Sequence, residues 1–465
     1  SSQEISSLVD RRRSSCSHHL AMFQRGMLHK PLDRMLRRGV GRSMPWKHED
    51  ALRCLLPVAS GGSVSSCGGT SSSSKVDSGL AKALGVGCSL GAVLLLMKDM
   101  RQNGSGLSNC ETEQAVDIPM LTYNLLSPPL ARSSRFPSLK KEDLDAKRRY
   151  KKIQARLEVA TAAGTVIGLQ EVDLTFAGKL HAFFAEKGYC AVFAQYGTDF
   201  NGYMGVMMAW PRQAYEAEEI EISRVSDTAP KELWPEKVWP APATGSLSRH
   251  EVKSVIGCDP PRTKETFDEW LVAQNRRNEA IYVRLKPRGQ PGAKSFVVAT
   301  YHMPCLFGSA PKVRVMNIHI SLLLQRLHDF AKGDPCVLLG DFNIKPPDSA
   351  YSLAASGGDL QSLKAWPAEV EGLQERLPAE APFSDGLRSA YKEFHGSEPL
   401  FTNFAQVGTD EPFCETLDYI WFTPNSWKVV RCPPLPTGRD QVFGPFPSRQ
   451  EPSDHIPLMA TMRLS

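Results

Sequence analysis

Short apolar runs that end in polar residues alternate along this chain with longer segments whose apolar side chains recur at helical spacing. Short apolar runs bounded by turn residues are typical of buried strands, and recurrence at helical spacing predicts helices. We therefore expect helices at 140–163, 176–187 and 313–330. Strands are expected at 120–126, 166–171, 189–194, 203–210, 280–285, 296–301, 336–340, 417–422, 427–431 and 458–462. Strands outnumber what one parallel wound sheet needs, and helices separate only some of them, which favours a layered α/β (α+β) sandwich with mixed sheets.

The predicted strand at 336–340 is followed at once by Asp341 and, two residues further on, by Asn343. Side chains alternate between the two faces of an extended chain, so we expect Asp341 and Asn343 to point the same way and Phe342 to point into the core. A carboxylate and a carboxamide held side by side at a strand end suit the positioning and deprotonation of a water molecule. A turn is the alternative interpretation, because Asp and Asn are common in turns.

Polar residues also follow or interrupt other apolar strands, and an apolar strand cannot bury a charge cheaply. Six strands that end in this way predict one polar cluster at a single edge of the sandwich. Mg²⁺ prefers carboxylate and carboxamide oxygens, so Glu171 with Asn124 and Asp454 is a candidate hard-cation site. Taken singly, each polar residue equally fits a surface acid, a cap or a surface histidine. The full set is Asn124, Glu171, His302, Asp341 with Asn343, Asp418, and Asp454 with His455.

The composition is that of an ordinary globular protein, with 42% hydrophobic and 23% charged residues among 465. The formal charge of +5 is uneven, because residues 1–115 carry 15 Lys/Arg and 9 Asp/Glu, which leaves −1 for the remainder. A near-neutral body argues against a broad basic surface for duplex nucleic acid and leaves room for a local basic groove. The eleven dispersed cysteines form no CxxC pair, which indicates reduced thiols in an intracellular compartment and no zinc site.

Residues 1–116 are basic and Ser/Gly-rich, and we expect them to be a largely disordered extension of a folded domain at 117–465. Residues 1–48 are rich in Arg and Ser and poor in acids, which is typical of an organellar transit peptide and equally of a solvated arm. The apolar stretch 84–97 is shorter than the roughly 20 residues of a membrane-spanning helix, so no stable membrane span is expected. A signal-peptide core, a short anchor and a packed segment remain alternatives for it. A mitochondrion or other organelle, the cytoplasm and the nucleus are thus open localisations. A Trp/Pro-rich stretch at 229–262 predicts an insertion or long loop.

Five short motifs surround the polar residues: Tyr123-Asn124, Leu169-Gln170-Glu171-Val172, Gly340-Asp341-Phe342-Asn343, Leu417-Asp418-Tyr419-Ile420 and Ser453-Asp454-His455. In this order they resemble the endonuclease/exonuclease/phosphatase superfamily, and the resemblance covers about 117–465. Three longer segments are similar to its carbon-catabolite-repressor deadenylase and nocturnin branch: Asp341 to Tyr351, Phe401 to Phe404, and Pro452 to Leu458. The resemblance implies a DNase I-like fold, which is a four-layer sandwich of two mixed β-sheets flanked by helices. It also implies a metal-dependent phosphoric-ester hydrolase (nuclease or phosphatase), with 117–465 as its catalytic domain.

The resemblance implies which residues bind the metal ion. Glu171 would be the principal Mg²⁺ ligand, assisted by Asn124 and, through a water molecule, by Asp454. Mn²⁺ is an alternative ion for the same ligands.

The resemblance likewise implies the catalytic residues. Asp341 would orient and deprotonate the attacking water, and Asn343 would hold water or phosphate. His455 and His302 would contact the scissile phosphate, and Asp418 would support the imidazolium of His455. In-line attack at phosphorus builds negative charge on the nonbridging oxygens, which a cation and two histidines can neutralise.

The leading hypothesis is a Mg²⁺-dependent phosphodiesterase that hydrolyses RNA, most simply a deadenylase-like 3′-exoribonuclease that releases 5′-mononucleotides. Deadenylases usually show Asn-Thr-His-Leu where this chain has Thr300 to Met303, and their Trp-bearing segment is replaced here by Ser127 to Pro137. These departures affect the specificity for poly(A) and leave the phosphodiester chemistry intact. One alternative is a nocturnin-like phosphatase acting on a small phosphorylated nucleotide or dinucleotide, and another is a catalytically inactive binding module. The expected partner is the RNA or nucleotide substrate, and the sequence predicts no particular protein partner.

Overall fold

The computed structural model describes residues 116–235, 267–290 and 292–464. The predicted extension at 1–116 lies outside these ranges apart from its last residue, and so do the stretch 84–97 and most of 229–262. The expectations of a targeting segment and of a localisation therefore stay predictions. Within the described ranges, no helix is long and apolar enough to cross a membrane. The cysteines in these ranges are free thiols: Cys190, Cys305, Cys336, Cys414 and Cys432.

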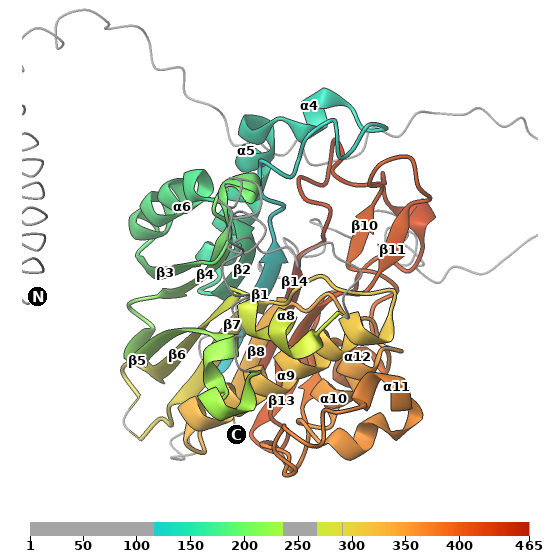
Figure 1. The fold of residues 1–465 in the computed structure, drawn as a ribbon. Coiled ribbons are helices and arrows are strands. Elements are labelled where there is room, and N and C mark those ends of the chain that lie inside the picture. The colour runs from blue at the N-terminus through green and yellow to red at the C-terminus, as the bar shows by residue number, and fades with distance from the viewer. Residues whose placement is uncertain (1–115, 236–266, 291, 465) are drawn as a thin grey trace, which may run out of the picture. The chain divides into compact units, whose positions relative to one another are not determined.

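Two six-stranded sheets form the centre of the domain (Figure 1). Their strand orders are β13-β14-β1-β2-β4-β3 and β5-β6-β7-β8-β12-β9. Strands β1 and β2 are parallel, and so are β7 and β8. Strand β1 pairs antiparallel with β14 and β8 pairs antiparallel with β12, so both sheets are mixed, as predicted. The first sheet comprises β1 (Asp117–Asn124), β2 (Val166–Val172), β3 (Tyr189–Gln195), β4 (Gly205–Pro211), β13 (Trp427–Arg431) and β14 (Leu458–Leu464). The second comprises β5 (Tyr215–Arg224), β6 (Glu279–Pro287), β7 (Phe296–His302), β8 (Cys336–Asp341), β9 (Arg388–Ser389) and β12 (Asp418–Phe422). A hairpin of β10 (Asn403–Ala405) and β11 (Phe413–Glu415) forms a separate two-stranded sheet, and Asn403 bridges to His455.

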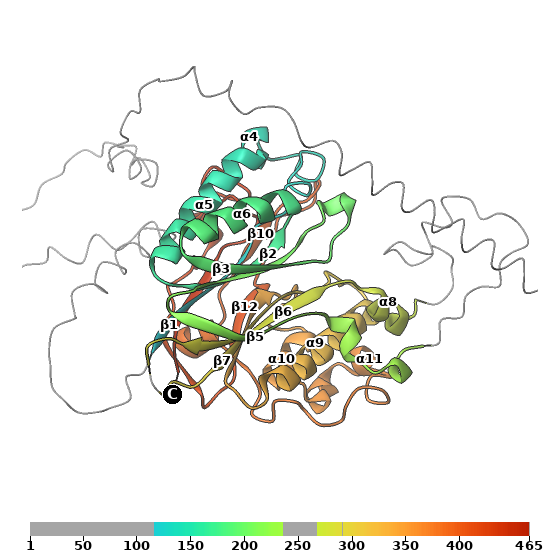
Figure 2. The same cartoon turned by 90° about the vertical axis from the view of Figure 1, so that its left-hand side faces the viewer.

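Helices cover the outer face of each sheet, so the domain has four layers (Figure 2). Helices α5 and α6 pack on the first sheet through one hydrophobic cluster, and α8, α9 and α10 pack on the second through another. The predicted four-layer sandwich is thus confirmed. Among the described residues the α-helices are α4 (Lys141–Leu144), α5 (Ala146–Ala162), α6 (Leu174–Glu186), α8 (Glu269–Asn275), α9 (Ala310–Ala331), α10 (Ser349–Ala355), α11 (Pro367–Val370) and α12 (Ala390–His395). The helix expected at 140–163 is divided at Asp145, whose extended backbone and carboxylate cap the start of α5.

A third hydrophobic cluster fills the space between the sheets, and it includes Met208 from β4, Val298 from β7 and Leu339 from β8. The sheets approach closely at Gly168, where an added Cβ would lie 2.9 Å from Oγ1 of Thr300. Next to this point the amide of Gln170 donates a hydrogen bond of 3.0 Å to the same hydroxyl. Because Gln170 directly precedes a predicted metal ligand, this contact locks the polar ends of the two sheets to each other.

Candidate active site

The pairing of the strands brings the predicted residues to one edge of the two sheets. In the second sheet, His302 pairs in register with Asp341 across the parallel strands β7 and β8, and Asp418 pairs with Asp341 across β8 and β12. In the first sheet, Asn124 ends β1 beside the end of β2, which carries Glu171. Residues paired directly across strands point to the same face, so the side chains of His302, Asp341 and Asp418 meet. The fold therefore brings the predicted polar residues together at a single edge.

Glu171 reaches this cluster because β2 is irregular at its end. The register between β2 and β4 shifts between Leu169 and Val172, and Glu171 has a φ of 53°. A bulge re-aims the side chain that it carries, and a left-handed backbone at a residue other than glycine is a strained conformation often found at functional sites. The two carboxylate oxygens of Glu171 accept hydrogen bonds from Nδ2 of Asn124 at 3.2 Å and from the backbone N–H of Ser127 at 3.1 Å. The carboxylate is therefore held in one orientation.

One carboxylate oxygen of Asp341 lies at the centre of the site. Oδ2 accepts a hydrogen bond of 2.8 Å from Nδ2 of Asn124, and it lies 3.4 Å from Nε2 of His302 and 3.6 Å from Nε2 of His455. The other oxygen accepts the backbone N–H of Asn343 at 3.0 Å. The residue is 1% exposed. Three nitrogens thus converge on a buried carboxylate oxygen, which fits a group that must hold a water molecule in a defined position.

His455 is paired with a second carboxylate on the opposite side of its ring. Its Nδ1 lies 2.8 Å from Oδ2 of Asp418, and this oxygen also accepts a hydrogen bond of 2.6 Å from the hydroxyl of Thr402. Burial opposes the charge on the imidazole, but the carboxylates of Asp418 and Asp341 outweigh it and raise the pKa of His455 well above its ordinary value. The ring is therefore a buried imidazolium, which is the state required to neutralise charge on a phosphate.

Asp454 belongs to a segment that is tied to the first sheet. The hydroxyl of Ser453 donates to the backbone oxygen of Asn124 at 2.7 Å and accepts from the backbone N–H of His455 at 3.2 Å. Burial raises the pKa of Asp454, and the charge of Glu171 adds to this increase. Two carboxylates that disfavour each other's ionisation are suited to share a cation, because the cation removes their repulsion.

The chemistry of the donor groups can be compared with that of a divalent cation. Glu171 and Asp454 offer hard carboxylate oxygens, as Mg²⁺ requires. Asp341, Asp418 and His455 also lie close enough together to hold a metal ion. However, the two carboxylates lie at opposite ring nitrogens of His455, and both nitrogens of an imidazolium carry hydrogen, so this ring has no free lone pair for a metal ion. The pair Glu171 and Asp454 fits the cation better, and their role as ligands stays a prediction.

The two predicted amides have defined contacts. The carboxamide oxygen of Asn124 accepts the backbone N–H of Leu126 at 2.9 Å, so its nitrogen faces the two carboxylates. Asn343 does not follow the alternation of a strand, because β8 ends at Asp341 and Asn343 has a φ of 51°. Its side-chain nitrogen donates to the backbone oxygen of Met303 at 3.0 Å. Both amides therefore brace the backbone around the site, and their roles toward metal and phosphate stay predictions.

Sequence reasoning missed an arginine that supports the site by binding backbone oxygens next to it. Arg149 of α5 is completely buried, and its guanidinium donates to the backbone oxygens of Leu125, Leu126 and Pro452, each at 2.5 Å. It thus joins the chain that follows Asn124 to the chain that precedes Asp454. Burial lowers the pKa of Arg149 to about 10. Nothing in the sequence distinguishes this arginine from its basic neighbours on a charged helix.

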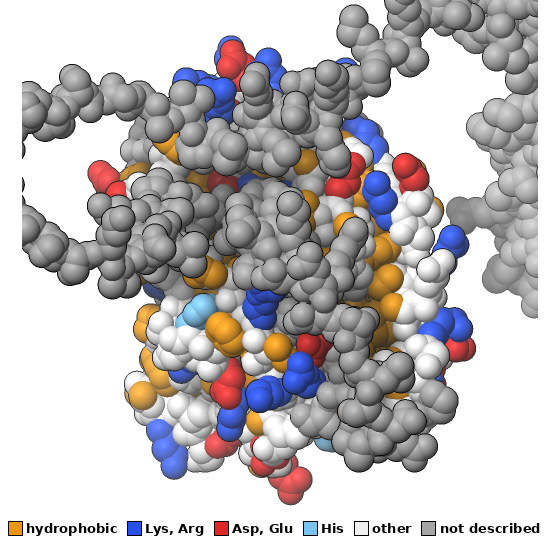
Figure 3. All heavy atoms as spheres, turned by 180° about the vertical axis from the view of Figure 1, so that it is seen from behind, with side chains coloured by type: hydrophobic (Ala, Val, Ile, Leu, Met, Phe, Trp, Pro, Cys, Tyr) orange, Lys and Arg blue, Asp and Glu red, His pale blue; other side chains and the backbone are white. Residues whose placement is uncertain are grey.

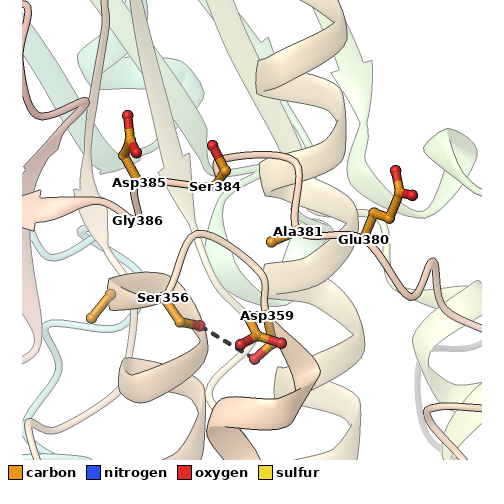
Figure 4. A pocket seen from close by; sticks show the side chains of 8 residues that line it. Ser356, Asp359, Glu380, Ala381, Ser384, Asp385 and Gly386 are labelled. Carbon is orange, nitrogen blue, oxygen red and sulfur yellow. Dashed lines mark hydrogen bonds between the residues drawn. The ribbon is translucent and has the colours of Figure 1, made fainter.

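A separate hollow lies between the end of α10 and residues 380–386, and none of its lining side chains belongs to the site (Figure 4). It contains three acids, Asp359, Glu380 and Asp385, but their carboxylates point in different directions. The hydroxyl of Ser356 donates to the backbone oxygen of Asp359 at 3.3 Å. Because the acids do not converge, the hollow is not a second metal site.

Comparison with known proteins agrees with the fold. The model of the Endonuclease/Exonuclease/phosphatase family matches residues 121–455. The chain is 29% identical over 199 residues to nocturnin of Drosophila melanogaster, over 43% of this chain and 29% of nocturnin. It is 33% identical over 135 residues to the CCR4-Not complex 3'-5'-exoribonuclease subunit Ccr4 of Aspergillus niger, over 28% of this chain and 19% of that subunit. The chain thus spans less than a third of the length of these two relatives.

A solved structure confirms the fold. ANGEL2, a 2',3'-cyclic phosphatase, superposes with a TM-score of 0.52 at 17% identity, over 78% of this chain and 99% of ANGEL2. The range matched by the family model contains every residue predicted for the site, from Asn124 to His455. The chain therefore belongs to the Endonuclease/Exonuclease/phosphatase family of phosphoric-ester hydrolases.

Proposed function

We propose that this chain is a Mg²⁺-dependent phosphodiesterase that hydrolyses RNA, most simply a deadenylase-like 3′-exoribonuclease that releases 5′-mononucleotides. The observation that carries the proposal is the convergence of Asn124, His302 and His455 on one oxygen of Asp341, beside the carboxylate of Glu171. The likeness to Ccr4, whose name states a 3'-5'-exoribonuclease, supports RNA as the substrate class.

Each residue has a role that follows from its contacts. Asp341 orients the attacking water and accepts its proton, and general base catalysis of this kind contributes ~10²–10⁴-fold. His455, charged because of Asp418, faces the nonbridging oxygens on which negative charge accumulates. Glu171 and Asp454 would hold Mg²⁺, or alternatively Mn²⁺, and a bound cation would supply further charge neutralisation at the phosphate.

The test uses the purified chain of 465 residues with oligoadenylate, mixed-sequence RNA and single-stranded DNA of equal length, each with Mg²⁺, with Mn²⁺ and with a chelator. We expect stepwise shortening of RNA from the 3′ end that requires the metal ion and is lost in Asp341→Asn. Asp410→Asn is the matched control, because Asp410 is an exposed acid outside the site. Equal product from the wild type and Asp341→Asn, or no product on any polymer, would overturn the proposal.

A phosphatase acting on a small phosphorylated nucleotide or dinucleotide is the second candidate. The chain after residue 115 has a formal charge of −1, which favours a compact substrate over a long polyanion. On the face shown in Figure 3, basic and acidic side chains of the described residues are interspersed. The likeness to nocturnin and to ANGEL2 is compatible with either candidate.

The two candidates differ in the product that they release. A phosphatase frees inorganic phosphate from nucleotide 2′- or 3′-phosphates and leaves oligoadenylate at its full length. An exoribonuclease frees nucleoside 5′-monophosphates and no inorganic phosphate. Measuring both products from the same preparation therefore assigns the substrate class.

A further inference from the structure

The two histidines of the site differ in the side chain that contacts their Nδ1 atom. His455 has the carboxylate of Asp418 at its Nδ1, as described above. His302 instead has the phenol of Tyr196, whose hydroxyl oxygen lies 2.5 Å from its Nδ1. The two rings pack edge to face, with centroids 6.0 Å apart and an interplanar angle of 70°. Nothing in the sequence motifs pointed to Tyr196, which lies 106 positions before its partner.

Tyr196 is held rigidly. It directly follows β3 and is 8% exposed, as part of the hydrophobic cluster between the sheets. Its backbone N–H and that of Gly197 both donate to the backbone oxygen of Met204, at 3.1 and 2.7 Å. The backbone of His302 is fixed as well, because its oxygen accepts from the side chain of Asn278 at 2.8 Å. Neither partner can move away without breaking several contacts.

The position of the protons follows from the chemistry of the phenol. Burial, together with the nearby charges of Glu171 and Asp341, raises the pKa of Tyr196 well above its ordinary value, so the hydroxyl keeps its hydrogen. A phenol that keeps its hydrogen can donate it to Nδ1 of a neutral imidazole. That imidazole then carries its own hydrogen on Nε2, because a neutral ring has a single N–H. The Nε2 of His302 is the nitrogen that lies 3.4 Å from Oδ2 of Asp341.

A phenol suits this place better than a second carboxylate would. The site already holds the half-buried carboxylate of Glu171 and the buried carboxylates of Asp341, Asp418 and Asp454. Another buried negative charge would carry a large desolvation cost and would repel the four present. The phenol orients the ring by a hydrogen bond and adds no charge.

We propose that Tyr196 is a positioning residue of the active site: its hydroxyl donates to Nδ1 of His302, holds the ring in the tautomer with hydrogen on Nε2, and directs that N–H toward Asp341 and the reacting phosphate. The contact of this N–H with the phosphate rests on the proposed function, whereas the tautomer of His302 does not. His302 then acts as an oriented hydrogen-bond donor.

The first measurement is independent of activity. Nitrogen-15 spectra of the histidine side chains distinguish a nitrogen that carries hydrogen from one that accepts, and His302→Asn assigns the signals of His302. At a pH where this ring is neutral, we expect Nδ1 as acceptor and Nε2 as N–H in the wild type. In Tyr196→Phe we expect this preference to be lost. A wild-type ring with hydrogen on Nδ1, or a spectrum unchanged in Tyr196→Phe, overturns the proposal.

The second measurement is a double-mutant cycle on turnover. Tyr196→Phe should lower kcat about tenfold, the kinetic equivalent of one hydrogen bond, with little change in KM. In the His302→Asn background the same change should have almost no further effect, because Tyr196 acts through His302. Tyr215→Phe is the matched control, since Tyr215 is a buried tyrosine of the same hydrophobic cluster that packs on Phe296. A tenfold loss that persists in the His302→Asn background contradicts the proposal.

These two measurements separate the inference from the proposed function. If the wild type is inactive on every substrate, the proposed function fails, and the spectra alone decide the role of Tyr196. If the wild type is active and the spectra do not change, the proposed function stands and the positioning role fails.

Discussion

Replacing Arg149 with methionine tests whether the site depends on the buried guanidinium that binds the neighbouring backbone. The change leaves the backbone oxygens of Leu125, Leu126 and Pro452 without their donor. A buried polar group left unpaired costs about 1–3 kcal/mol, so three oxygens together cost on the order of 6 kcal/mol. Burial of the guanidinium lowers its pKa to about 10, which corresponds to a cost of about 3 kcal/mol that the apolar side chain no longer carries. The net expectation is a loss of about 3 kcal/mol in the free energy of unfolding, a large part of the ~5–15 kcal/mol typical of a folded domain.

Urea denaturation of the purified chain, followed by far-ultraviolet circular dichroism, measures this loss. The matched control is Arg148→Met, one residue away on the same helix, where an exposed arginine lies 3.8 Å from an exposed Glu142. Exposed pairs contribute little, so we expect this control to stay within about 0.5 kcal/mol of the wild type. Because Arg149 also joins the segments that carry Asn124 and Asp454, Arg149→Met should bind Mg²⁺ more weakly than the control at a temperature where both are folded. An Arg149→Met variant as stable as Arg148→Met would refute the reasoning.

Three further predictions concern single contacts. Asp418→Asn removes the charge that raises the pKa of His455. The activity should therefore fall at a lower pH on the alkaline side of the pH–rate profile. A raised pKa contributes stability that is full below the unfolded pKa of about 6.5 and is lost as the pH rises through the folded value. Urea titrations should therefore show the widest gap between wild type and variant at mildly acidic pH, and a gap that widens with pH would contradict the assignment. Glu171→Gln keeps the size but not the charge of the side chain, so calorimetric titration should show Mg²⁺ affinity reduced about tenfold or more, and an unchanged affinity would remove Glu171 from the metal site. Gly340→Ala adds a Cβ that would lie 2.3 Å from the backbone oxygen of Tyr301, so thermal unfolding should reveal a cost of about 1–3 kcal/mol, and an unchanged Tm would show that the strands separate freely.

The apolar pattern identified the strands that are buried on both faces, such as β7 and β8. The strand β8 reads as a continuous apolar run because its residues are buried throughout, and its bounds differ little from the expectation. The strand β5 was missed for the opposite reason. It forms one edge of the second sheet, it alternates between more and less exposed residues, and four of its ten positions are glutamates. A half-exposed edge strand that carries several acids has little apolar signal, although its backbone pairs as well as that of any other strand.

The two interpretations of the segment after Gly340 each describe part of what is found. Phe342 is buried, as strand alternation predicted, but the strand stops at Asp341 and the chain then turns through the left-handed backbone of Asn343. The carboxylate of Asp341 accepts the backbone N–H of Asn343, as aspartates in turns do. The turn and the site are therefore the same structure, since the turn holds the carboxylate in place.

The sequence by itself predicted which polar side chains form the cluster and at which strand ends they stand, because burial periodicity and residue type are local properties of the chain. The tertiary structure alone decided which atoms face each other. The bond from Asn124 to Asp341 joins residues 217 positions apart, and the bond from Arg149 to Pro452 spans 303. Such contacts depend on sheet register, on the bulge at Glu171 and on the approach of the two sheets, and none of these leaves a local pattern. The predicted carboxylates and histidines were therefore readable in advance, whereas Arg149 and Tyr196, which hold them in position, became visible only once the chain was folded.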